Sequence, residues 1–201
     1  MNKIKVVRLD PSYSEQVQNI WIESLPDNLK SIVGKYIMDK YISLFFEDKQ
    51  SLGIGLTNEK KLVGFVMYGN DKVIIKKLIK INIFKIIKSF LTSIVKLEIK
   101  KTLNYINCFF FIFFCRKIEN KLRFSHIELL IICISPLNQG KKYGSFLIQE
   151  SIKNHQNYFK NYNGIFVKTL KRDTQNISFY EKNNFNIIDE VFGRVYLKYV
   201  K

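Results

Sequence analysis

The residues of this chain that are best placed to do chemistry lie in one short segment, 132–145, which reads ICISPLNQGKKYGS. An apolar run ends at Ser135, a loop carries Gln139, Gly140 and Gly144, and apolar residues then recur at helical spacing. A strand, a glycine-bearing turn and a helix N-terminus point backbone N–H groups and the positive end of the helix dipole at an anion. The segment therefore favours phosphate binding. The alternative is an ordinary strand, turn and helix whose lysines are solvated.

A single carboxylate stands in the apolar run before this turn. Glu128 lies within SHIELLIICI, where a buried carboxylate is costly without a partner. Burial would raise the pKa of this carboxyl group and suit it to general base catalysis. Glu128 precedes Ile134 by six residues, so strand alternation predicts that both side chains share a face. The alternatives are an edge residue that faces solvent or a carboxylate paired with a lysine, and His126 is a weaker candidate base.

The glycine-bearing turn resembles the Q/R-x-x-G-x-G/A signature of the GNAT N-acetyltransferases, which bind the pyrophosphate of acetyl-coenzyme A. Gln139 occupies the first position of that signature and Gly144 the last, while Lys142 replaces the middle glycine. A glycine permits close backbone approach and unusual φ values, so Lys142 must adopt a helical φ or be strained. In compensation, Lys142 and Lys141 bring positive charge to the turn.

A second segment, 165–185, reads IFVKTLKRDTQNISFYEKNNF and resembles the family pattern N-x-x-A-x-x-Φ-Y-E-K-x-G-F, in which Φ is apolar. Asp173, Asn176 and Asn184 replace the usual asparagine, alanine and glycine. Asn184 can still end a helix, because asparagine tolerates a left-handed φ. Asp173 is a preferred helix N-cap. Five residues match the family pattern: Phe179, Tyr180, Glu181, Lys182 and Phe185.

The resemblance implies roles for these residues. Tyr180 matches the family tyrosine that donates a proton to the coenzyme A thiolate, and its alternative role is a core aromatic beside Phe179. Histone-acetylating members carry a base glutamate at the position of Glu128. The resemblance also places Asp173 among the cofactor-binding residues, although its residue type favours the N-cap. The backbone of Ile132, Cys133 and Ile134 should hold the pantetheine arm and polarise the thioester, and the pyrophosphate should rest on Gln139, Gly140, Lys141, Lys142, Tyr143 and Gly144.

The elements that must position these residues follow from hydrophobic periodicity. Their order matches the GNAT family, and we predict an α+β GNAT fold with a central mixed, mostly antiparallel sheet, flanking helices and a helical insertion between the third and fourth strands. The resemblance covers residues 1–70 and 124–201, so we expect a single domain over 1–201. The predicted strands are 5–9, 51–57, 62–68, 126–134, 164–170, 185–190 and 194–200.

The insertion at about 71–123 is basic and apolar. It holds 13 Lys/Arg and three Asp/Glu, a net charge of 13 − 3 = +10. We expect a helical pair that packs on the sheet and walls the acceptor site, with Phe90, Leu91, Ile94 and 109–114 buried. The alternatives are weak association with an anionic membrane through a basic amphipathic surface, or a partner-binding face. Its most apolar segment, 106–115, is too short to span a bilayer.

Composition bounds the remaining possibilities. The formal net charge is +16, and three cysteines lack metal-ligand spacing, so we expect buried free thiols and no metal. The start MNKIKVVRLDP has no signal-peptide apolar region, and a cytoplasmic protein is expected. The resemblance implies an acetyl-CoA-dependent N-acetyltransferase, and the charge suggests a small anionic acceptor such as an amino sugar. Alternatives are a protein N-acetyltransferase, or a non-catalytic CoA-binding or membrane-peripheral module. No nucleic-acid partner is expected, and the sequence identifies neither the acceptor nor the oligomeric state.

Overall fold

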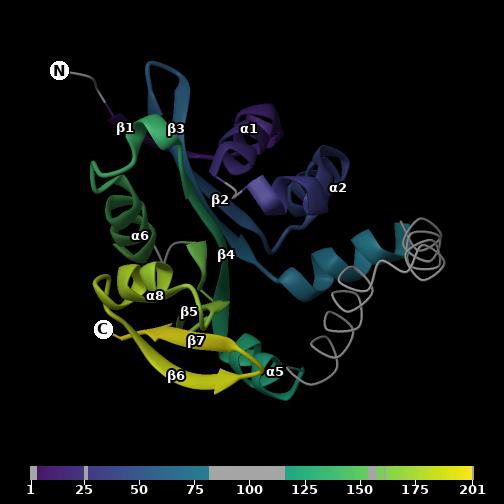
Figure 1. The fold of residues 1–201 in the computed structure, drawn as a ribbon, viewed down its shortest axis with the longest axis vertical. Helices are drawn as coiled ribbons and strands as arrows, with labels where there is room; N and C mark the ends of the chain where they lie inside the picture. The colour runs from purple at the N-terminus through teal and green to yellow at the C-terminus, as the bar shows by residue number, and fades with distance from the viewer. Residues whose placement is uncertain (1–3, 25–26, 82–115, 154–157, 161, 201) are drawn as a thin grey trace.

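The computed structural model describes the backbone of residues 4–24, 27–81, 116–153, 158–160 and 162–200, and the side chains of these ranges except 27–34 and 116–118. Seven strands form one sheet in the order β1-β2-β3-β4-β5-β7-β6 (Figure 1). Every neighbouring pair is antiparallel except β4 and β5, which are parallel. The strands are β1 (Ile4–Arg8), β2 (Leu52–Asn58), β3 (Lys61–Gly69), β4 (His126–Ile134), β5 (Gly164–Leu170), β6 (Phe185–Val191) and β7 (Arg194–Tyr199).

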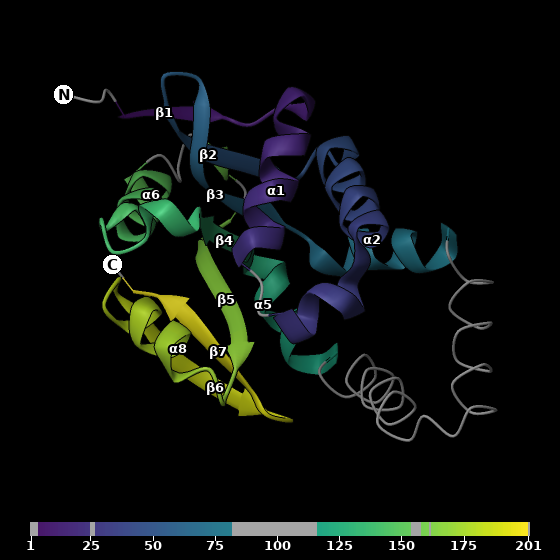
Figure 2. The same ribbon diagram turned by 45° about the horizontal axis from the view of Figure 1, so that its top comes forward.

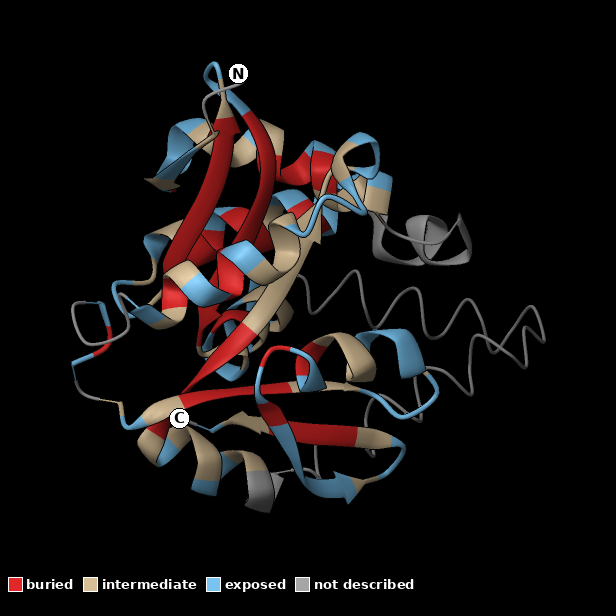
Figure 3. Cartoon of the chain, turned by 90° about the vertical axis from the view of Figure 1, so that its left-hand side faces the viewer, coloured by how far each residue is buried: buried red, intermediate tan, exposed pale blue. Residues whose placement is uncertain are grey.

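Helices cover both faces of the sheet (Figure 2). The helices α1 (Ser14–Ser24) and α2 (Asp27–Glu47) lie on one face, and α6 (Tyr143–Lys153) and α8 (Thr174–Glu181) lie on the other. Each face has its own hydrophobic core, one built with Leu147 of α6 and the other with Val17 of α1. The central strands between these layers are mostly buried (Figure 3). The predicted α+β fold, with a mixed and mostly antiparallel sheet, is therefore confirmed.

The described parts of the insertion are helical. Residues 71–81 form a helix directly after β3, and α5 (Arg116–Ser125) leads into β4. The predicted burial of Phe90, Leu91, Ile94 and 109–114 lies outside the described residues. Among the residues that the structure describes, no helix combines the length and apolar character needed to cross a bilayer.

Strand β4 contains an irregularity that changes which way its side chains point. Leu129 pairs with Tyr68 and Ile131 with Met67, so Leu130 is an additional residue with no partner of its own in the register. Side chains alternate along a strand, and one additional residue reverses the alternation beyond it. Ile127, Leu129, Ile132 and Ile134 all pack with the core beneath α6, whereas Cys133 packs with the core beneath α1.

The additional residue Leu130 makes a bulge in β4, and this bulge changes the face on which the Glu128 side chain was expected. Glu128 lies between Ile127 and Leu129, both of which face α6, so its own side chain points to the opposite face. Ile134 packs on the α6 side. The prediction that Glu128 and Ile134 share a face is therefore wrong, because counting residues along the strand assumes a regular alternation that the bulge interrupts.

Candidate active site

The sheet opens between its two parallel strands. β4 pairs with β5 over His126–Leu129, opposite 164–167, and the register within the described residues continues no further. β4 nevertheless runs on to Ile134 along β3, while β5 continues along β7. The edge of β4 that faces β5 therefore carries backbone groups without a ladder partner from Leu130 onward. Such groups are strong hydrogen-bonding sites for an extended ligand.

The backbone of β4 alternates between β3 and this opening. Ser135 N–H donates to the Val63 carbonyl on β3 at 2.9 Å, so Cys133, two residues earlier, also directs its backbone groups at β3. Ile132 and Ile134 must then direct theirs into the opening. Of the three residues whose backbone was predicted to hold a pantetheine arm, the geometry suits Ile132 and Ile134, and Cys133 is committed to the sheet.

The glycine-bearing turn follows directly from the open end of β4. A 3₁₀ turn at Pro136–Asn138 precedes it, and Gly140 adopts a φ of 77°. Lys142 has a φ of 61°, so it occupies the left-handed conformation that glycine usually supplies. Of the two possibilities for Lys142, a helical φ or strain, the structure has strain. This conformation costs roughly 1–2 kcal/mol for a residue other than glycine.

The turn presents donors at the start of α6. The Lys142 carbonyl accepts from Phe146 N–H at 3.0 Å, which makes Lys142 the residue at which the helical bonding begins. The backbone N–H groups of Tyr143, Gly144 and Ser145 then have no partner within the helix, as in the first turn of any α-helix. A Cβ on Gly144 would lie 3.2 Å from the Phe179 ring, so a small residue here lets α6 approach α8.

Two side chains of the turn are held by local hydrogen bonds. Gln139 Nε2 donates to the Ile134 carbonyl at 3.2 Å, and Lys141 Nζ donates to Asn138 Oδ1 at 2.9 Å. The Ile134 carbonyl also accepts from Ser24 Oγ at 3.3 Å, which ties the end of α1 to the open end of β4. Gln139 thus braces the turn, and the predicted anion contacts would come from the backbone N–H groups.

Tyr180 lies on α8 beside the same opening. Its side chain is 7% exposed, and its ring packs edge-to-face on Phe179 and Phe185, with centroids 5.3 and 5.7 Å away. Burial raises the pKa of Tyr180 above the ordinary tyrosine value, and the Cys133 thiol and Tyr68 hydroxyl raise it further. Tyr180 belongs to the same hydrophobic core as Ile132 and Ile134, so its ring lies on the α6 side of the open part of β4. A phenol with a raised pKa stays protonated at neutral pH and can act as a proton donor.

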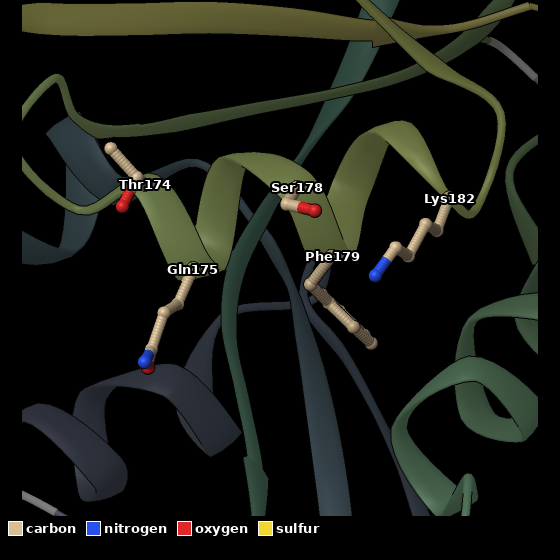
Figure 4. Close-up of a pocket in the computed structure, with 5 residues that line it drawn as sticks. All are labelled: Thr174, Gln175, Ser178, Phe179 and Lys182. Carbon is tan, nitrogen blue, oxygen red and sulfur yellow. The ribbon is translucent and has the colours of Figure 1, made fainter.

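A cavity of about 570 Å³ borders α8 (Figure 4). Phe179 extends from α8 toward Gly144 of α6, and Lys182 brings a positive charge to the cavity wall. The cavity lies near the glycine-bearing turn, because the Phe179 ring also approaches Gly144. Its lining residues are Thr174, Gln175, Ser178, Phe179 and Lys182.

Asp173 and Asn184, whose residue types differ from the family pattern, flank the two ends of α8. Asp173 is the N-cap, and its side chain accepts from Asn176 N–H at 3.3 Å and from Asn176 Nδ2 at 2.6 Å. The helix ends at Glu181 with Lys182 as its C-cap, and Asn184, two residues further on, adopts the left-handed φ of 65° that its residue type allows. The predicted cap at Asp173 is confirmed, and its contact with a cofactor stays a prediction.

Glu128 lies in a buried ion cluster on the opposite face of the sheet. Its side chain is 1% exposed. Arg123 donates to Oε2 from Nη2 at 2.6 Å and from Nε at 3.0 Å, and Lys168 Nζ lies 2.9 Å from Oε1. Both carboxylate oxygens are therefore engaged. Burial raises the pKa of Glu128, and the charges of Lys168 and Arg123 offset that effect only in part. The pairing with a lysine is the alternative that the sequence had left open.

The cluster draws residues from six elements. Lys168 Nζ also contacts Asp71 Oδ2 at 3.1 Å and Glu119 Oε1 at 3.3 Å. The Tyr41 hydroxyl donates to Asp71 Oδ1 at 3.1 Å, and the Tyr196 hydroxyl donates to Glu119 Oε1 at 3.4 Å. Burial would lower the pKa of Lys168, but the three carboxylates outweigh it and raise that pKa. With two cations and three anions, the cluster has a formal charge of 2 − 3 = −1.

Sequence reasoning missed Arg123, Lys168 and Asp71. Lys168 carried a usable signal, because a lone lysine inside the apolar strand IFVKTL needs an anionic partner. The described ranges hold no group of three or more His, Cys, Asp or Glu side chains that could bind a metal ion. Burial raises the pKa of Cys133 to about 12, which keeps this thiol protonated. Cys108 and Cys115 lie outside the described residues.

Comparison with known proteins identifies the fold. No family model and no curated protein matches the sequence. PaiA N-acetyltransferase from Thermoplasma acidophilum, solved with coenzyme A, is 15% identical with a TM-score of 0.60 over 98% of both chains. The GNAT domain of S. lividans PAT is 10% identical, with a TM-score of 0.59 over 98% of this chain and 89% of that one. The ribosomal-protein-S18-alanine N-acetyltransferase from Escherichia coli is 11% identical, with a TM-score of 0.54 over 98% and 93%.

These likenesses span nearly the whole of this chain and of each of the three solved structures. The chain therefore has the fold of the GNAT acetyltransferases, as the two sequence motifs predicted.

Proposed function

We propose that this protein is an N-acetyltransferase that uses acetyl-coenzyme A. One observation carries the proposal: the open edge of β4, the donors at the start of α6 and Tyr180 lie on the same side of the sheet, around one hydrophobic core. This arrangement suits an extended ligand that has an amide-containing arm, a diphosphate and a sulfur atom. The similarity in fold to PaiA N-acetyltransferase, which was solved with coenzyme A, supports the same ligand.

The proposed chemistry follows from what each group can do. Acetyl-coenzyme A supplies a thioester whose carbonyl carbon is electrophilic. The acceptor nitrogen forms a bond to that carbon, and the carbon–sulfur bond breaks as its electron pair leaves on sulfur. Backbone N–H groups of Ile132 and Ile134 suit the task of orienting the arm, and Tyr180 is the proposed general acid that protonates the thiolate. The nitrogen releases a proton, which makes the amide and free coenzyme A the products.

Glu128 was the sequence candidate for the base that removes this proton. The base role stays a prediction, and two observations weigh against direct transfer. Both carboxylate oxygens already contact cations, and the side chain points away from α6 and α8. Glu128 also precedes Ile132 by four residues, roughly 13 Å along a strand. A direct base must come within hydrogen-bond reach or one water molecule of the proton that it removes.

For the acceptor, we propose a chemical class and no single compound. The net charge of +16 favours an anionic small molecule that carries an amine, such as an amino sugar. A protein N-terminus is the second candidate, and it is favoured by the structural likeness to the ribosomal-protein-S18-alanine N-acetyltransferase. A non-catalytic CoA-binding module is the third, and the strained Lys142 in place of glycine is the observation that favours it.

A two-stage experiment tests the proposal. Calorimetric titration of the full chain with acetyl-coenzyme A should show binding at a single site. Release of free thiol should then accelerate when amines from a panel of amino sugars, polyamines and N-terminal peptides are added, relative to acetyl-coenzyme A alone. Binding without acceleration by any amine would favour the binding module. No binding to folded protein would overturn the enzymatic proposal.

A further inference from the structure

The ion cluster around Glu128 joins the two ends of the insertion. Asp71 is the first residue of the helix 71–81, and Glu119 and Arg123 lie on α5, which returns the chain to β4. The two carboxylates are 48 positions apart in the sequence. One ammonium group, Lys168 Nζ on β5, contacts both of them as well as Glu128. A single side chain of the sheet therefore bridges the exit and the return of the insertion.

The helix α5 depends on these charges for its attachment. Of its described side chains, 119–125, none is fully buried, and Phe124 is 90% exposed. Among its charged side chains, Glu119 and Arg123 are 12% and 9% exposed because they point into the cluster. The helix 71–81 differs, since its Ile74 is completely buried in the core beneath α1. Apolar packing can hold the first end of the insertion. Among the described residues, the second end is attached by the ion pairs together with two hydrogen bonds, from Lys72 Nζ to Asn120 Oδ1 at 3.1 Å and from Asn163 N–H to the Ser125 carbonyl at 2.7 Å.

We propose that Lys168 acts as a clasp that fixes both ends of the 71–123 insertion to the sheet, and that α5 depends on this clasp more strongly than the helix 71–81. The clasp is a conformational device and does not require acetyl transfer. Buried ion pairs contribute little net stability compared with apolar packing, but removing one partner leaves uncompensated charge. The expected role of Lys168 is therefore to select one arrangement of the insertion ends.

Hydrogen–deuterium exchange of the full chain, followed by mass spectrometry, tests the clasp. In Lys168→Met, exchange in peptides from 116–125 should be about tenfold faster, with a smaller increase in 71–81. Peptides from α6 and the glycine-bearing turn should be unchanged. The matched control is Lys171→Met, because Lys171 pairs with Glu190 at 2.7 Å but its side chain is 62% exposed. That control should exchange like the wild type throughout.

Two milder variants keep the test decisive if Lys168→Met does not fold. Glu119→Gln should loosen 116–125, and Asp71→Asn should loosen 71–81, each without affecting the other segment strongly. The proposal is overturned if both segments keep wild-type protection in these variants. It is also overturned if protection falls evenly across α6 and β2, because that result would mean a general loss of stability with no specific attachment.

Discussion

The two faces of the sheet at β4 differ in how far their hydrogen-bonding groups are already paired. On the α6 and α8 face, the strand leaves backbone groups without ladder partners at an opening. On the opposite face, three carboxylates and two cations pair with one another, and of the two cations only Arg123 keeps a buried nitrogen, Nη1, without a hydrogen-bond partner among the described residues. The first region keeps backbone groups without ladder partners, and the second has used most of its hydrogen-bonding capacity. We infer that unsatisfied groups mark the binding side and that satisfied charges mark the structural side.

The largest expected effect tests the binding side directly. Gly144→Glu should weaken acetyl-coenzyme A binding by about 10³-fold or more, because a carboxylate at the first turn of α6 opposes an anion and the side chain meets the Phe179 ring. Isothermal titration calorimetry measures this. Gln149→Glu adds the same charge on an exposed position of the same helix and should bind normally. Equal weakening in both variants would attribute the effect to net charge.

The second prediction concerns the structural side. Glu128→Gln leaves Arg123 and Lys168 without their shared carboxylate, so the free energy of unfolding should fall by about 3 kcal/mol. Urea denaturation measures this change. If Glu128 is structural, the variant should lose less than about tenfold in kcat at a temperature at which it stays folded. A loss of kcat with unchanged stability would restore Glu128 as the catalytic base and reverse the comparison of the two faces.

The third prediction concerns the proposed acid. Tyr180→Phe should lower kcat by about 10²-fold, within the range of general acid catalysis, and leave coenzyme A affinity nearly unchanged. Because burial raises the pKa of Tyr180 above the ordinary value of 10.0, loss of its proton should not limit kcat in the wild type below about pH 10. Tyr199→Phe is the control, since Tyr199 packs on Phe185 in the same aromatic group. An unchanged kcat in Tyr180→Phe would reassign Tyr180 to packing.

The smallest expected effect tests the backbone strain at Lys142 in the glycine-bearing turn. Lys142→Gly should raise the free energy of unfolding by about 0.5–1 kcal/mol, because glycine adopts the left-handed φ without steric cost. Lys141→Gly removes the same charge from a neighbouring position that lacks a positive φ, and it should not stabilise. Thermal unfolding of both variants provides the measurement. A stabilised Lys141→Gly would show that charge repulsion, and not backbone strain, is the origin of the gain.

The two regions also differ in how well sequence predicts them. The glycine-bearing turn was predictable because its residues are close in sequence, and each has a local physical reason for its type. On the same local grounds Asp173 was assigned as a helix N-cap, which is confirmed, and Asn184 was expected to tolerate a left-handed φ, which it adopts two residues beyond the C-cap. The ion cluster was not predictable, because Lys168 meets Asp71 across 97 positions and Glu119 across 49. No local rule indicates which distant carboxylates a buried lysine will contact.

The prediction of the face to which the Glu128 side chain points was wrong for a different reason. A regular strand would have placed it on the face of Ile134, and the reasoning from periodicity was sound for such a strand. Leu130 adds one residue to β4 opposite β3, and nothing in the run IELLIICI distinguishes a bulged strand from a regular one. Sequence reasoning therefore identified the strand, turn and helix on the α6 face, and it placed the Glu128 side chain on the wrong face.

The bulge at Leu130 has a consequence for how this chain can change over evolutionary time. Substitutions at this position alter only packing, because the neighbouring register does not depend on the side chain. Deletion of one residue here would exchange the faces of every side chain from Ile131 to Ile134, and it would rotate the hydrogen-bonding groups of Ile132 and Ile134 away from the opening. We therefore expect related proteins to carry other apolar residues at this position, because Leu130 packs against the core beneath α1, while they preserve the length of the strand.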